Sequence, residues 1–293
     1  MKYEIYKILF KILSPRSLAR LGYYYLHFRT LNWPIFLNLT NPKKFNEKII
    51  YLKLYNRFEN AHLLVDKFEV RSYIENIIGN EYLVPIYGAF DNVDEIEFEE
   101  FPKKFVLKAN QSSGHNIIVK EKNSLNIVSV KKMLKAWLLI DYSFFGEWQY
   151  KGIKNKILVE KFIENSDENP LLDYKFFCFN GEPMFIQIDI DRFTNHSRNF
   201  YDLNWSLIDL EILYPKSNRE IPIPNNLVLM IKLVRKIALD LSNKMSFVRI
   251  DFYDHNNQVY FGEITFHPEG GCGPIIPKVY DNILGDLLNI QIV

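Results

Sequence analysis

FVRIDFYDHNNQVYFGEITFHPEGGCGP, residues 247–274, is the most informative stretch of this 293-residue sequence. Its apolar and polar side chains alternate with the period of two of a half-buried strand, which predicts two strands, Phe247–Tyr253 and Val259–Phe266, joined by a polar turn. One face would be apolar and would carry Val248, Ile250, Phe252, Tyr260, Gly262, Ile264 and Phe266. The opposite face would carry Arg249, Asp251, Glu263 and Thr265.

The register of this hairpin decides whether its two carboxylates meet, because a slip of one residue moves a side chain to the other face. A three-residue loop, Asn256–Gln258, would place Asp251 opposite Glu263, and Arg249 opposite Thr265. Opposed carboxylates, with Cβ atoms about 4.5–5.5 Å apart, repel each other, so a cation is expected between them. Mg²⁺ takes one or two carboxylates together with phosphate oxygens and water, which predicts a magnesium–nucleotide site. A solvent-facing hairpin with scattered charges is the alternative interpretation.

The remainder of the chain predicts an α+β fold, because short strands in hairpins are interleaved with a few helices. Further strands are expected at 105–109, 116–119, 157–162, 174–179 and 184–188. Helices are expected from Asn41-Pro42 through Arg57, over 61–78 with Gly79 as the C-cap, and around 130–140 and 226–242. The sequence contains no internal repeat and no low-complexity tract.

Composition excludes several classes of protein. With 36 basic and 35 acidic residues, the chain lacks the basic field that neutralises nucleic-acid phosphates, so no nucleic-acid partner is expected. Cys178 and Cys272 are too few for a disulfide framework or a zinc site and suit a reducing compartment. No apolar run reaches the roughly 18–20 residues of a membrane span. These features predict a cytoplasmic protein.

The first thirty residues form a basic segment that contains a single acid, Glu4. Apolar residues recur there at helical spacing on both sides of Ser14-Pro15, which predicts two short amphipathic helices. Two interpretations are open. The helices pack on the main domain with a solvated basic face, which is the commoner case, or they rest on an anionic membrane or a membrane-bound partner at the inner face of the cell membrane.

Residues 105–120, FVLKANQSSGHNIIVK, predict a strand, a polar loop and a second strand. Backbone N–H groups of such a loop can hold phosphate, Gly114 permits close approach, and Lys108 supplies a charge to the same group. A small Gly-Ser hairpin loop is also a common structural feature, so this signal is weak by itself. The pattern is not a Walker A motif.

Two later segments carry candidate side chains. In ILVEKFIEN, residues 157–165, Glu160 and the backbone near Phe162 could hydrogen-bond an adenine edge. In DYKFFCFNGEP, residues 173–183, an Asn180-Gly181 turn predicts a hairpin in which Asp173 and Lys175 share a face, by default as an ion pair.

These segments together resemble the ATP-grasp superfamily, and more closely its TupA-like family of polysaccharide and teichuronopeptide biosynthesis. The similarity runs from about Lys44 to Leu287 and includes FNEKIIYLKLYNR, DKFEVRSYI, EWQYKGI, NFYDLNW and YFGEITFHPEGG. The resemblance implies an ATP-grasp fold, in which two α+β lobes with antiparallel sheets enclose ATP and Mg²⁺. The expected parts are a helical extension at 1–40, a helical part at 41–100, a nucleotide-binding lobe at 101–163 and a catalytic and metal-binding lobe at 164–293.

Site residues follow from the resemblance position by position. The nucleotide would be bound by Lys67, Lys108, the lid residues Ser112, Ser113, Gly114, His115 and Asn116, the adenine-pocket residues Glu160, Lys161, Phe162 and Ile163, and Lys175, with Asp173 or Glu168 at the ribose. Metal ligands would be Asp251, Glu263 and Thr265, where Thr265 departs from the Asn found in many relatives. Arg249, Lys108 and Lys175 would be catalytic by stabilising negative charge at the transferred phosphate.

The implied reaction is ligation of a carboxylate to an amine through an acyl phosphate, with release of ADP. The carboxylate would belong to a uronic acid or another acidic unit of a bacterial surface polymer. A mix of guanidinium, imidazole and aromatic groups suited to an anionic sugar lies at Arg192, His196, Arg198, Tyr201 and Trp205. A surface loop anchored by core aromatics is the alternative there. Two other functions stay open: a glycosyl or phosphoryl transferase that uses the same nucleotide site, and a nucleotide-binding scaffold without turnover.

Overall fold

The computed structural model describes residues 2–31, 36–164, 171–192 and 194–292. Its chain divides into two compact units. The first unit comprises Met1–Tyr6 and Asn60–Leu171, and the second comprises Lys7–Glu59 and Leu172–Val293.

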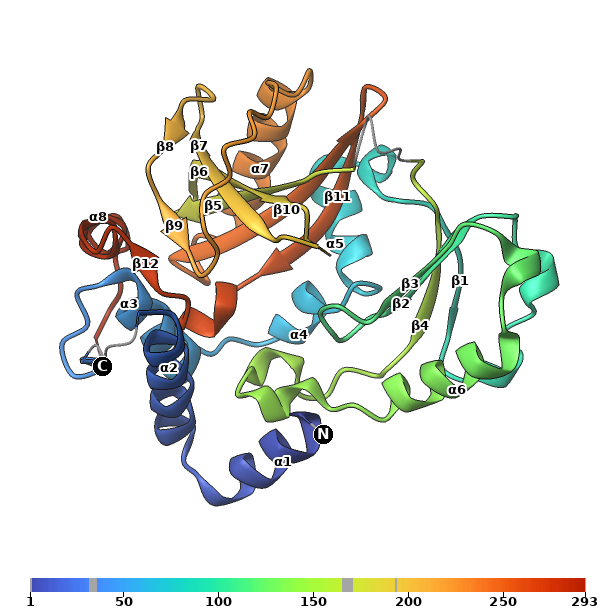
Figure 1. Cartoon of the computed structure of the whole chain (residues 1–293), viewed down its shortest axis with the longest axis horizontal. Helices are drawn as coiled ribbons and strands as arrows, with labels where there is room; N and C mark the ends of the chain where they lie inside the picture. The colour runs from blue at the N-terminus through green and yellow to red at the C-terminus, as the bar shows by residue number, and fades with distance from the viewer. Residues whose placement is uncertain (1, 32–35, 165–170, 193, 293) are drawn as a thin grey trace. The chain divides into compact units, whose positions relative to one another are not determined.

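The first unit is built on a four-stranded antiparallel sheet with the strand order β1-β4-β2-β3 (Figure 1). The strands are β1 (Ile86–Phe90), β2 (Phe105–Ala109), β3 (Asn116–Val119) and β4 (Ile157–Lys161). The helices are α4 (Ala61–Val65), α5 (Val70–Ile78) and α6 (Ile127–Leu138). Alternate side chains of β2 and β4 pack against Val130 and Leu134 of α6, which buries one face of the sheet.

The second unit is built on a six-stranded antiparallel sheet with the order β11-β10-β5-β6-β7-β8. Its strands are β5 (Asp173–Phe179), β6 (Glu182–Ile190), β7 (Ser197–Asp202), β8 (Leu207–Ile208), β10 (Phe247–His255) and β11 (Gln258–Thr265). A two-stranded sheet joins β9 (Glu211–Ile212) to β12 (Ile275–Ile276). The other helices of the chain are α1 (Lys2–Ile12), which crosses the boundary of the units, and α2 (Pro15–Leu31), α3 (Phe45–Tyr55), α7 (Leu227–Leu241) and α8 (Val279–Leu287).

The two faces of this larger sheet differ. Helix α7 packs on β6 and β10. On the other face an aromatic cluster contains Phe177, Phe179 and Phe247 together with Phe45 of α3. The polar side chains described below lie on the same face as this cluster, because Arg249 and Asp251 alternate with buried Val248 and Ile250 along β10. The predicted α+β fold with antiparallel sheets is confirmed.

The prediction of a single helix over 61–78 was wrong in one respect. The helical segment is interrupted between Val65 and Val70, which divides it into α4 and α5. Asp66 causes the break. Its Oδ1 accepts hydrogen bonds from the backbone N–H groups of Phe68 at 2.8 Å and Glu69 at 3.2 Å, a local pattern that competes with helical bonding.

The β10–β11 hairpin has the predicted pairing of Asp251 with Glu263 and of Arg249 with Thr265, which is confirmed. The predicted three-residue loop was wrong. Asn256 and Asn257 form a two-residue turn with φ angles of 51° and 61°, as the right-handed twist of a tight hairpin requires.

A β-bulge accounts for the difference, because the register shifts by one residue between Asp251 and Phe252. Gly262 is the additional residue of β11. Phe252 therefore pairs with Phe261, and Phe261 rather than Tyr260 is buried beside it, which corrects the predicted apolar face. A Cβ atom on Gly262 would lie 3.0 Å from the carbonyl oxygen of Asp251, so the close approach of the strands favours glycine.

Among the described residues, no helix combines the length and apolarity needed to cross a bilayer.

Candidate functional site

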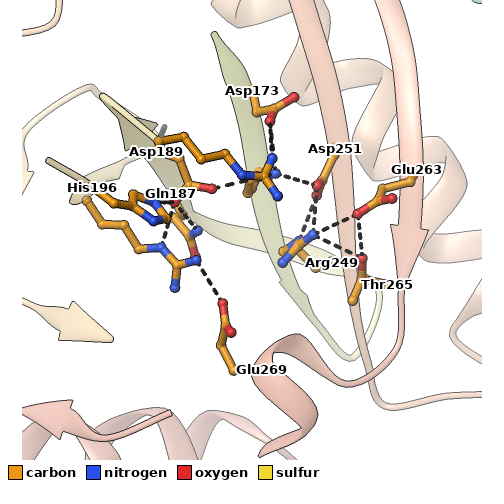
Figure 2. A network of polar contacts seen from close by, with 12 residues as sticks. Asp173, Gln187, Asp189, His196, Arg249, Asp251, Glu263, Thr265 and Glu269 are labelled. Carbon is orange, nitrogen blue, oxygen red and sulfur yellow. Dashed lines mark hydrogen bonds and ion pairs between the residues drawn. The ribbon is translucent and has the colours of Figure 1, made fainter. Parts of the chain in front are cut away.

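A buried ion pair lies on β10 of the six-stranded sheet, next to the edge strand β11 (Figure 2). The Asp251 carboxylate accepts two hydrogen bonds from the guanidinium of Arg249, at 2.8 Å from Nε to Oδ1 and 2.8 Å from Nη2 to Oδ2. Lys175 of the neighbouring strand β5 donates to Asp251 Oδ2 at 2.9 Å. Strand pairing fixes this arrangement, because Asp251 lies opposite Lys175 in the β10–β5 register. All three side chains are buried.

Arg249 also lies between the two carboxylates of the hairpin. Its Nη2 donates to Glu263 Oε1 at 3.1 Å and to Thr265 Oγ1 at 3.0 Å, besides its bond to Asp251. The cation that the register of the hairpin requires is therefore supplied by the chain itself. A metal ion at Asp251 and Glu263 would have to compete with this guanidinium for the same oxygens.

Lys175 is surrounded by acids. Besides Asp251, its Nζ lies 3.3 Å from Asp173 Oδ2 and 3.9 Å from Asp189 Oδ2. Burial lowers the pKa of Lys175, but the charges of Asp173 and Asp251 outweigh it and raise the pKa above its ordinary value. Lys175 is therefore a buried cation with a full positive charge at neutral pH.

Asp189 on β6 forms a second centre in the network. Its Oδ1 accepts from Arg198 Nε at 2.6 Å and from Gln187 Nε2 at 3.0 Å, and lies 3.2 Å from His196 Nε2. Arg198 in turn contacts Glu269 at 2.8 Å. Burial would raise the pKa of Asp189, but the charges of Arg198 and Lys175 hold it well below its ordinary value.

Both signs of charge therefore alternate along one face of the sheet, from Glu263 on β11 to Arg198 on β7. Burial raises the pKa of Asp251, and its two cationic partners oppose that effect. Such a face can bind a polyanion only by exchanging internal partners for the ligand, since these cations are engaged by carboxylates.

The predicted phosphate loop of the first unit, residues 110–115 between β2 and β3, contains buried polar atoms with no hydrogen-bond partner among the described residues. These atoms are Gln111 Oε1, Ser112 Oγ and His115 Nδ1. Lys67 Nζ donates to the backbone carbonyl of Ser112 at 2.7 Å. Burial and the nearby charge of Lys67 lower the pKa of His115. Since buried polar groups are normally paired, these three atoms are available to water or to a polar ligand.

Asp66 and Asn110 hold this loop in place, and sequence reasoning missed both. Asn110 is fully buried and donates to Asp66 Oδ2 at 2.8 Å. Its Oδ1 accepts from the backbone N–H of Lys156 at 2.7 Å, and its backbone carbonyl accepts from the N–H of Lys67. This pair fixes Lys67 beside the loop. The signal available in the sequence was an Asp directly before a candidate phosphate-binding Lys.

The remaining nucleotide candidates of the first unit lie on β2, in or next to the β2–β3 loop, and at the end of β4. Lys108 forms an ion pair with Glu160 at 2.5 Å. Phe162 is buried, Lys161 is exposed, and Ile163 is partly buried. Ser113, Gly114 and Asn116 are exposed in or next to the loop. Glu168 lies outside the described residues.

The predicted acceptor residues have different environments. Tyr201 and Trp205 are buried and stack at 4.4 Å, and Trp205 Nε1 donates to the carbonyl of Ile221 at 2.9 Å, so their rings form part of the core. The ring of His196 packs against that of Tyr214, with the centroids 3.8 Å apart and the planes tilted by 33°. Arg192 is exposed and reaches Asp173 at 3.5 Å.

The donor set at the hairpin fits magnesium in kind, since Asp251, Glu263 and Thr265 supply hard oxygen atoms. No group of three or more His, Cys, Asp or Glu side chains suited to a metal occurs in the part of the chain that the structure describes. The protein therefore offers two carboxylates and a hydroxyl, and phosphate oxygens would have to complete the coordination.

A family model described as TupA-like ATPgrasp matches residues 47–289. No curated protein matches the chain. Solved structures with similar folds include D-alanine–D-alanine ligase from Bacillus anthracis, at 17% identity and a TM-score of 0.48, over 77% of this chain and 66% of that one. The corresponding enzyme from Helicobacter pylori is 16% identical with a TM-score of 0.44, over 87% and 73%. The ATP-grasp ligase PsnB, solved with Mg and ADP, is 8% identical with a TM-score of 0.43, over 80% and 60%.

Proposed function

The chain belongs to the TupA-like ATP-grasp family and has the ATP-grasp fold, and on this premise we propose that it is an ATP-dependent carboxylate–amine ligase. It would form an amide and release ADP and phosphate. The observation that carries the proposal is the buried face on which Arg249 and Lys175 surround Asp251. Buried charges are costly, so a chain that maintains this many on one sheet face is expected to use them.

The first unit would bind the nucleotide. The unpartnered atoms of Gln111, Ser112 and His115 supply polar groups for phosphate oxygens. Lys67 and Lys108 supply positive charge there, and Glu160 with the backbone of residues 161–163 supplies hydrogen-bonding groups for adenine. Asp173, which belongs to the second unit, or Glu168, which lies outside the described residues, would contact the ribose.

The second unit would bind magnesium through Asp251, Glu263 and Thr265, and the ion would neutralise the phosphate oxygens of ATP. Arg249 would stabilise charge on the transferred phosphate. Lys175 would hold Asp251 ionised and oriented and would approach the same phosphate.

The reaction would proceed in two displacements. An oxygen of the substrate carboxylate attacks the γ-phosphorus, the bond to the β-phosphate oxygen breaks, and ADP leaves. A neutral amine then attacks the acyl carbon, phosphate leaves with the C–O bonding pair, and the nitrogen loses a proton to give the amide.

The carboxylate donor would be a uronic acid or acidic unit of a bacterial capsular or other cell-surface polysaccharide, free or as a polymer precursor. Exposed Arg192 supports an anionic acceptor, because its guanidinium is accessible and can form paired hydrogen bonds with a carboxylate. Arg198 and His196 would shape the acceptor site through Asp189. The use of ATP supports a cytoplasmic location.

Purified protein supplied with ATP, Mg²⁺, a panel of uronic acids and amine donors tests the proposal. We expect ADP release that requires both a carboxylate and an amine, and a hydroxamate when hydroxylamine replaces the amine. Accumulation of AMP would refute the acyl-phosphate reaction. ADP release without dependence on an amine would indicate a phosphoryl transferase, sugar-nucleotide turnover a glycosyltransferase, and tight ATP binding without turnover a scaffold.

A further inference from the structure

Helix α2 is apolar on two opposite sides. On the first side Ala19, Tyr23 and Leu26 pack in a cluster with Leu39 and Ile50, so this side attaches the helix to the second unit. A stripe that packs in this way accounts for one apolar face of an ordinary surface helix.

The second side carries Leu21, Tyr25 and Phe28, whose side chains are between 48% and 63% exposed. At about 100° per residue, these three positions lie roughly 140–200° around the helix from buried Tyr23. They therefore form a continuous apolar stripe that faces away from the core. Scattered exposed apolar residues are ordinary, but an aligned stripe marks an interaction site.

Helix α1 also has an exposed apolar stripe. Ile5, Ile8 and Ile12 are between 51% and 73% exposed and lie on one side of the helix. Lys7 and Lys11 lie along one edge of that stripe, on a flank that also carries Glu4, so α1 is amphipathic with charged residues beside its apolar side.

Charge is segregated in the same segment. Residues 1–31 contain six basic residues and one acid, for a net charge of +5. The whole chain has 36 basic and 35 acidic residues, which leaves 30 and 34 in residues 32–293, for a net charge of −4. A surface that is both apolar and locally basic is complementary to a layer with an apolar interior and anionic headgroups.

We propose that α2 forms a docking surface for an anionic membrane, with the exposed stripe of Leu21, Tyr25 and Phe28 inserted among the acyl chains and the exposed Arg20 and Arg29 against the headgroups. Pairing with a second copy of this chain is disfavoured, because each copy would bring a segment with a net charge of +5 to the contact. The inference is independent of the ligase reaction, since docking uses neither ATP nor the polar network.

Co-sedimentation with vesicles tests the proposal on the full chain without nucleotide. We expect binding to vesicles of phosphatidylcholine with phosphatidylglycerol, weak binding to phosphatidylcholine alone, and loss of binding at high salt. Each basic residue near an anionic surface contributes about fivefold to the partition coefficient, so Arg20→Gln with Arg29→Gln should lower it by roughly 25-fold. Leu21→Ser with Phe28→Ser should lower it at least about tenfold.

Matched controls lie on α7 of the same unit. Lys232→Gln with Lys236→Gln removes two charges, and Val228→Ser with Leu239→Ser removes two exposed apolar side chains; both double variants should bind as the unaltered chain does. Circular dichroism verifies that every variant is folded. Equal binding to neutral and anionic vesicles would overturn the proposal. So would absence of vesicle binding together with a dimer that Leu21→Ser/Phe28→Ser dissociates.

Discussion

Replacing Asp251 with Asn removes the negative charge at the centre of the buried network and preserves the shape of the side chain. The amide NH2 takes the place of one carboxylate oxygen, so the hydrogen bonds from Arg249 and Lys175 to that oxygen are lost, and those that remain are donated to a neutral carbonyl. Breaking a buried ion pair by removing one partner costs about 3–5 kcal/mol. Glu263 and Asp173 remain beside the two cations, so we expect the free energy of unfolding to fall by about 3 kcal/mol, at the lower end of that range.

Urea denaturation followed by circular dichroism measures this loss, with Asp209→Asn as the control. Asp209 forms an ion pair with Lys216 at 2.5 Å but is 79% exposed, so its replacement should cost below about 1 kcal/mol. The double variant Arg249→Gln/Asp251→Asn should lose less than the sum of the single variants, because the second substitution removes a charge that the first left unpaired.

An equal decrease in the free energy of unfolding in Asp251→Asn and Asp209→Asn would refute the view that Asp251 neutralises two buried cations. A second result would also refute it. If Mg²⁺ without nucleotide stabilised the unaltered chain and this gain disappeared in Asp251→Asn, a metal rather than Arg249 would neutralise the carboxylates in the resting protein.

Three further predictions follow from single contacts. Ser112→Ala should weaken ATP binding roughly five- to tenfold in a fluorescent-nucleotide titration and leave stability unchanged, because the buried hydroxyl has no partner among the described residues. Replacing the exposed Ser129 of α6 with Ala should change neither quantity. Gly262→Val should cost about 1–3 kcal/mol in urea and reduce ATP turnover, since its Cβ would meet the Asp251 carbonyl at 3.0 Å; unaltered turnover would contradict the role of the bulge. The depressed pKa of Asp189 contributes stability that is present above the ordinary pKa near 4 and is lost as pH falls below it. In a plot of unfolding free energy against pH, the acid side should therefore be less steep for Asp189→Asn than for the unaltered chain, by up to about 1.4 kcal/mol per pH unit. Equal slopes would contradict the depressed pKa of Asp189.

Local pattern was sufficient for the elements that carry the site. Strand alternation placed Arg249 and Asp251 on one face of β10 and predicted β2 and β3 with their observed bounds. The alternation of side chains with a period of two is visible in the sequence, so it can be recognised without knowing the partner strand. The helix break at Asp66 was missed, because an Asp inside an otherwise helical pattern shows only in three dimensions whether its carboxylate bonds the next N–H groups.

The pairing of Asp251 with Glu263 was predicted correctly, but from the wrong loop length. The sequence allowed either a three-residue loop or a two-residue turn with a bulge, and both pair Asp251 with Glu263. The choice depends on how closely the strands approach at Gly262, which is a contact between residues eleven positions apart. A contact of that kind lies outside any local pattern.

The sequence by itself determined which residues could do chemistry: an Arg, two carboxylates and a Thr on facing strands, a Lys before a Gly-Ser loop, and a basic apolar N-terminal segment. Only the tertiary structure decided which charges neutralise one another. The pairing of β10 with β5 sets Lys175 opposite Asp251. The guanidinium of Arg249, which donates to Glu263, occupies the place expected for a cation. Ion pairing depends on separation in space and on exclusion of water, and both are set by packing between strands far apart in the chain.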